Sequence, residues 1–62
     1  MDPAATSLMA HCENIDKLIA TIQQHRDDHF GADPEHVSWG IAESAGFIAE
    51  RLTDIVDHLD SM

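Results

Sequence analysis

The sequence is poor in basic residues and in cysteine, and it contains no long apolar run. Lys17, Arg26 and Arg51 are the only basic residues against 12 acidic ones, so the net charge is −9 when the histidines are neutral. Cys12 is the only cysteine, which excludes an intrachain disulfide and a cysteine-based zinc site and is typical of a reducing compartment. Apolar stretches of two or three residues are too short to cross a membrane. We therefore expect a soluble cytoplasmic protein.

The strong negative charge narrows the classes of binding partner. A surface of this sign repels the phosphate backbone of nucleic acids and anionic lipids. The same field attracts basic protein surfaces, including those that normally hold DNA or RNA. We therefore expect a basic protein as partner, with no direct binding to nucleic acid or to membranes.

No set of residues in the sequence is typical of catalysis. Cys12 lies on an apolar stripe, so we expect a buried structural thiol there and not a nucleophile. No combination of serine, lysine or a glycine-rich phosphate loop forms a catalytic set. A chain of 62 residues also has little room for a pocket that would shift the pKa of a carboxyl group. We expect no enzyme activity and no cofactor.

The first half of the chain predicts a helix over about residues 3–30. Asp2 and Pro3 are an N-cap residue and a proline at the first helical position. Gly31 is typical of the glycine that follows a helix. Between these signals, apolar residues recur at steps of three and four, which indicates one stripe along a helix. The stripe consists of Leu8, Cys12, Ile15, Ile19 and Ile22, widened by Leu18.

The second half predicts a connection over residues 31–38 and a helix over about residues 39–60. Asp33 and Pro34 repeat the helix-start signal, and Ser38 is a second N-cap candidate. One helix from Pro34 and a short turn before a helix from Trp39 are both open, and Gly40 favours the second. The apolar stripe that follows consists of Ile41, Ala45, Ile48, Leu52, Ile55 and Leu59.

These elements predict a single all-α domain over residues 1–62. Two amphipathic helices joined by a tight connection form a helical hairpin. A lone hairpin leaves the edges of two wide stripes in water, and pairing two hairpins into a four-helix bundle would cover them. We therefore expect a homodimer, and the alternative is a monomeric hairpin with a third short helix. Small residues at Ala42, Ala45, Gly46 and Ala49 would allow another backbone to approach.

The acidic residues form the main candidate for a binding site. Glu43, Glu50 and Asp57 are spaced seven apart and so form a line along the second helix. A net charge of about 2–8 suffices to keep a small domain soluble, and this chain exceeds that range. A row of carboxylates can imitate phosphates to a cationic groove, and the alternative is a solvated face without a partner. The predicted partner-binding residues are Glu43, Glu50, Asp54, Asp57, Glu13, Asp16, Glu35 and Trp39.

The aromatic and histidine residues each allow two interpretations. Trp39 and Phe30 flank the connection, where large aromatics usually close the hairpin end over the core. An exposed Trp39 among acidic residues would instead indicate an interface anchor. His25 and His29 are spaced i, i+4, with His36 just beyond, which can hold zinc or nickel. Nothing provides a fourth ligand, and histidine is favoured at a helix C-terminus, so we predict no metal site.

Taken together, these features resemble a known class of proteins. A tiny, strongly acidic, all-helical chain without a catalytic set is similar to the small inhibitor proteins of phages and plasmids, among which anti-CRISPR proteins and other DNA mimics are best known. The stretch from Asp28 to Gly40 also resembles the connection in short mobile-element proteins. Anti-CRISPR proteins share no common motif, so the resemblance assigns no residue. It implies a CRISPR effector complex as partner, with carboxylates occupying its DNA-binding surface.

Three functional hypotheses follow from the sequence. The first is an inhibitor that presents acidic helices to a basic nucleic-acid-binding protein. The second is a homodimeric helical-bundle adaptor or antitoxin-like regulator that binds through apolar faces, with the acids only keeping it soluble. The third, and least favoured, is a metal-binding hairpin that uses His25, His29 and His36.

Overall fold

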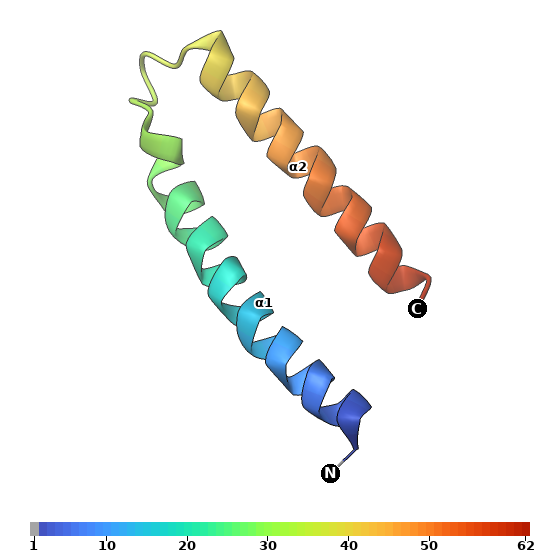
Figure 1. Ribbon diagram of the computed structural model, residues 1–62. Coiled ribbons are helices and arrows are strands. Elements are labelled where there is room, and N and C mark those ends of the chain that lie inside the picture. Colours follow the sequence, from blue (N-terminus) through green and yellow to red (C-terminus); the bar gives the residue numbers. More distant parts are fainter. Residues whose placement is uncertain (1) are drawn as a thin grey trace.

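The protein forms two long helices joined at one end by a short connection (Figure 1). Both helices extend from the connection toward the same side, so the chain runs in opposite senses along them (Figure 1). A computed structural model describes residues 2–62. Helix α1 spans Pro3–Asp27, a short 3₁₀ turn η1 spans His29–Gly31, and helix α2 spans Trp39–Asp60. No strand occurs among the described residues. The all-helical hairpin expected from the two apolar stripes is confirmed.

Helix α1 begins where its capping residues predict. The Asp2 carboxylate accepts a hydrogen bond from the Ala4 amide at 3.0 Å, and Pro3 occupies the first helical position. Because proline lacks an amide hydrogen, its position there leaves no donor unsatisfied. The regular helix ends at Asp27, three residues before the expected boundary at about Phe30.

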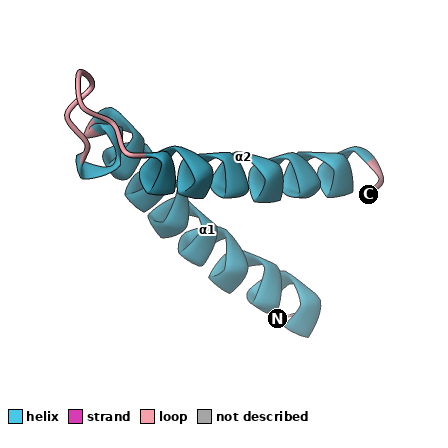
Figure 2. Ribbon diagram, turned by 90° about the horizontal axis from the view of Figure 1, so that it is seen from above, coloured by secondary structure: helices cyan, strands magenta, loops and turns pink. Residues whose placement is uncertain are grey.

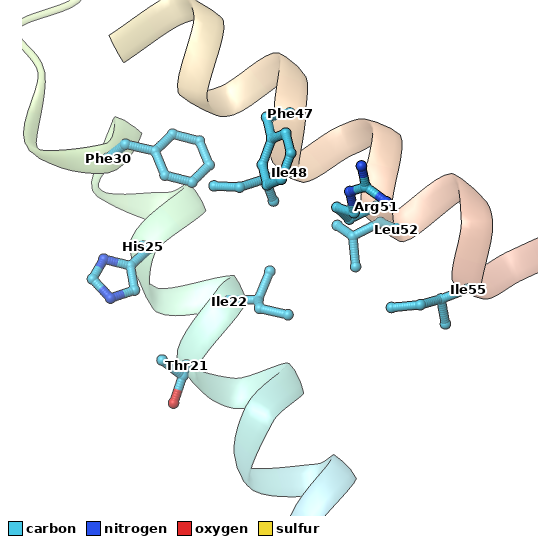
Figure 3. A pocket seen from close by; sticks show the side chains of 9 residues that line it. All are labelled: Thr21, Ile22, His25, Phe30, Phe47, Ile48, Arg51, Leu52 and Ile55. Carbon is cyan, nitrogen blue, oxygen red and sulfur yellow. The ribbon is translucent and has the colours of Figure 1, made fainter. Parts of the chain in front are cut away.

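A left-handed turn is the reason for this early end. His29, Phe30 and Gly31 have φ values of 53°, 56° and 76°, which no right-handed helix contains. A side chain in this region costs roughly 1–2 kcal/mol, whereas glycine adopts it freely. Gly31 therefore lies in the turn that follows the helix, and the regular helix ends four residues before it. The turn places the Phe30 side chain between the two helices, where it is half-buried (Figure 3).

The connection contains a turn and then the N-cap of α2. The His36 amide donates to the Asp33 carbonyl at 2.9 Å, and the Asp33 carboxylate accepts from the Glu35 amide at 3.0 Å. The Ser38 hydroxyl then accepts from the Ile41 amide at 3.2 Å. The structure thus selects the second of the two alternatives, a turn before a helix that begins at Trp39.

The two helices diverge from the connection and form an open V (Figure 2). The radius of gyration is 15.7 Å, whereas a compact chain of this length would have about 10.6 Å. Among residues 2–62, no side chain is fully buried. A Cβ atom added at Gly46 would meet no atom within 4 Å, so no other part of the chain packs against α2 at this residue. The hairpin therefore forms without closing over a core.

Replacing Ser38 tests how much its N-cap hydrogen bond stabilises α2. We expect Ser38→Ala to lower the stability of the helical state by about 1 kcal/mol, because the first-turn amide loses its acceptor. The matched control is Ser44→Ala, which lies inside the same helix and should be neutral or slightly stabilising. Thermal unfolding followed by circular dichroism at one fixed protein concentration measures both. Equal effects of the two substitutions would contradict the role of the cap.

Candidate functional site

An apolar groove lies between the two arms of the V. It has a volume of about 590 Å³. Figure 3 shows Ile22 of α1 directed toward α2, with Ile48, Leu52 and Ile55 of α2 on the opposite wall. Its remaining lining residues are Thr21, His25, Phe30, Phe47 and Arg51. The groove is the space that the two predicted stripes would fill if the helices were in contact.

The stripe residues far from the connection stay largely in solvent because the arms do not close, whereas Ile48 and Leu52 are half-buried. Ile55 is 55% exposed and Leu59 is 59% exposed, although both continue the stripe of α2. Leu8 on α1 is 63% exposed. Contiguous apolar surface of this kind is rare on a soluble monomer and marks a site of association. The structure therefore contains two amphipathic helices whose apolar sides are still available.

Cys12 is the clearest correction to the sequence-based predictions. We expected a buried structural thiol because Cys12 lies on the apolar stripe of α1, but the side chain is exposed. The stripe itself is present. Its burial requires a facing surface, and α2 diverges from α1 toward the termini (Figure 2).

Two arginines line the grooves, and sequence reasoning did not place them there. Arg51 lines the main groove, with its guanidinium 4.9 Å from the centre of the Phe47 ring and 3.4 Å from the Asp54 carboxylate. Arg26 lines two smaller neighbouring grooves and pairs with Asp27 at 2.6 Å. A signal for Arg26 existed, because it follows Ile22 by four residues and so continues the stripe.

No carboxylate lines any of these three grooves, although the chain has 12 acidic residues. Helix geometry explains the segregation. Glu43, Glu50 and Asp57 each precede a stripe residue by two positions, which rotates them about 160° away from the stripe. The acidic face of α2, defined here as Glu43, Glu50, Asp54 and Asp57, thus lies on the side opposite the groove.

Trp39 lies at the beginning of the same acidic face. It precedes Ile41 by two positions, as the carboxylates precede their stripe residues, and its side chain is 83% exposed. The default expectation that Trp39 closes the hairpin end over a core is therefore wrong. Phe30, on the other side of the connection, is half-buried and lines the groove. Trp39 and the carboxylates of the acidic face thus lie on one side of α2, with the tryptophan at the N-terminal end.

The other predicted partner-binding residues lie on different elements. Glu13 and Asp16 are exposed on α1, and Glu35 is exposed in the turn, where its amide binds Asp33. The structure does not bring these three residues onto the acidic face of α2. That face alone groups several of the predicted residues on one element.

The histidines do not come together in a cluster. His36 Nδ1 lies 3.2 Å from an Asp33 carboxylate oxygen, within the turn. In residues 2–62, no group of three histidine, cysteine, aspartate or glutamate side chains is arranged to hold a metal ion. The hypothesis of a metal site at His25, His29 and His36 thus has no geometric support.

Comparison of the chain with models of known protein families, with curated proteins and with solved structures finds no match. Within the described residues, neither helix is long and apolar enough to span a bilayer. The functional argument therefore rests on the two surfaces described above.

Proposed function

We propose that this protein is a small acidic inhibitor that binds a basic nucleic-acid-binding protein. Its acidic face on α2 would occupy the surface that otherwise holds DNA or RNA. The resemblance to anti-CRISPR proteins and other DNA mimics makes a CRISPR effector complex one such partner. In this proposal the protein acts by occupancy and not by catalysis.

The observation that carries the proposal is the position of Trp39. A tryptophan that is 83% exposed at the head of a carboxylate row lies on the side of α2 that no pairing of the apolar stripes would cover. Tryptophan is among the residues most enriched at binding hot spots. An exposed aromatic with no packing role, on the acidic face itself, supports an interface more than charge alone does.

Charge would give this interface its rate and its specificity. The net charge of −9 attracts a cationic surface over a distance and speeds the encounter. The carboxylates of the acidic face would then pair with arginine or lysine side chains that otherwise hold phosphate. Trp39 would contribute apolar contact at one end. The complex should weaken steeply as salt rises, because the contacts are charged and partly exposed.

The proposal can be tested by affinity capture. The tagged protein would be incubated with bacterial lysate and captured in two parallel samples. Bound proteins would be eluted from one sample with stepwise salt and from the other with duplex DNA. We expect a basic nucleic-acid-binding protein that both salt and DNA displace. A captured protein that DNA does not displace would contradict the DNA-mimic mechanism.

A second candidate function is favoured by the open groove. Here the chain pairs with a second copy into a four-helix bundle that serves as an adaptor or antitoxin-like regulator through its apolar faces. The acids would then only maintain solubility. Salt distinguishes the two candidates, since an apolar complex should persist at salt concentrations that dissociate a charged one.

A further inference from the structure

The accessible surface of the chain is far larger than that of a compact protein of its mass. It measures 5601 Å². A folded monomer of 6.8 kDa is expected to expose about 4,000 Å². The excess of about 1,600 Å² per chain, or about 3,200 Å² for two, falls in the range that obligate homodimers bury. The surplus surface thus has the size that a second copy would cover.

The groove also has a defined charge character. Its walls are apolar and Arg51 is the arginine that lines it, Arg26 lines the two smaller grooves beside it, and no carboxylate lines any of the three. Each guanidinium already has one carboxylate neighbour in solvent, but its five N–H donors leave room for a second. A fitting occupant is an apolar helix with a carboxylate at the edge of its apolar stripe.

The chain itself contains such a segment, which we name the α1 arm and define as residues 3–16. Its stripe residues Leu8, Cys12 and Ile15 are exposed and line none of the three grooves. Asp16, which follows Cys12 by four residues, stands at the edge of this stripe. The α1 arm therefore has both the apolar stripe and the flanking carboxylate that the groove requires.

We infer that a second copy of this chain occupies the groove, with its α1 arm lying between α1 and α2, and that the two copies do this reciprocally. The reciprocal arrangement satisfies two-fold symmetry, because the same arm and the same groove are used on both copies. It makes four helices, two from each copy. Both acidic faces of α2 stay outside, because they lie opposite the groove. The inference rests on the proposed pairing of two copies and does not depend on any partner of the acidic face.

The test is sedimentation equilibrium of the full chain over a range of concentrations, for three proteins. We expect the native chain to approach twice its 6.8 kDa mass. Ile15→Asp, in the α1 arm, should raise the dimer dissociation constant about a hundredfold or more, because it places a charge in an apolar contact. The matched control Ala10→Asp adds the same charge two positions before Cys12, on the outer side of α1. It should change the constant by less than about threefold, as exposed substitutions do.

The thiol of Cys12 gives a second readout that needs no substitution. We expect alkylation of Cys12 by a small thiol reagent to be about tenfold slower in the dimer than in the Ile15→Asp variant, because burial limits access to the thiolate. Helicity by circular dichroism shows that the variants still fold. A native chain that stays monomeric at all concentrations overturns both the pairing and the inference. A dimer that tolerates Ile15→Asp and leaves Cys12 fully reactive overturns the α1 arm while leaving the pairing intact.

Discussion

Reversing the charge of Glu50 and Asp57 to lysine is expected to abolish binding of the basic partner and to leave α2 at least as helical. Both residues belong to the acidic face, and each would repel the cationic groups it is proposed to contact. Removing close charge pairs from an interface typically costs about 1.5 kcal/mol or more each. We therefore expect the dissociation constant to rise by roughly a hundredfold or more for the double variant.

The helix should benefit from the same change. Glu50 and Asp57 stand four before and three after Asp54, so the native arrangement sets like charges against each other. A lysine at position 57, in the last turn of α2, also complements the helix dipole, which carbonyl groups make negative at that end. Among the described residues, Arg51 offsets the row through its 3.4 Å contact with Asp54. Carboxylates at this end destabilise the helix, which is expected if they serve an external partner.

A control variant separates the acidic face from total charge. Asp27→Lys with Asp28→Lys makes the same change in net charge, from −9 to −5 (two residues, two units each), at the end of α1. Binding to the captured partner would be measured by calorimetry at one salt concentration, and helicity by circular dichroism. Equal weakening by both double variants would assign the effect to net charge alone. Unchanged affinity of the Glu50 and Asp57 variant would show that the acidic face is not the interface.

The second large effect concerns the stability of the fold itself. Leu52 lines the main groove and one of the smaller grooves, so its side chain would contact a helix that fills them. Because no described side chain is fully buried within one chain, helical stability should depend on protein concentration, as in obligate dimers. We expect the thermal midpoint to rise with concentration for the native chain.

Leu52→Asp should remove this dependence. Losing the burial of one leucine costs about 2 kcal/mol per copy, and so about 4 kcal/mol for two copies. That corresponds to a dissociation constant roughly a thousandfold higher. Thr53→Asp, the adjacent residue turned away from the stripe, adds the same charge and should preserve the concentration dependence. A native midpoint that does not change over a hundredfold range of concentration would contradict an association-dependent fold.

Much of the local structure could be predicted from the residues themselves. The Asp2 and Ser38 caps are observed because a cap involves atoms only two or three residues apart. The acidic face and its separation from the apolar stripe follow from the same helical period. Arg26 could have been placed on the stripe by that period as well. A stripe defined by apolar residues alone leaves out a charged residue at the same spacing.

Other features were beyond the reach of sequence reasoning. The left-handed turn includes Phe30, a bulky residue that rarely adopts positive φ, so the sequence did not predict that the turn begins before Gly31. The exposure of Cys12 depends on which surface faces it, and periodicity only shows which residues share a side. This outcome depends on the angle between the two helices, which contacts between near neighbours do not predict.

The sequence by itself determined two amphipathic helices, where they are capped, and which side of each is apolar or acidic, because these depend on contacts between near neighbours in the chain. Only the tertiary structure decided that the hairpin stays open, that Arg51 lines the groove between the helices, and that Cys12 remains in solvent. Those properties depend on how residues far apart in the chain meet, and here the two helices diverge from the connection, so their stripes do not close (Figure 2).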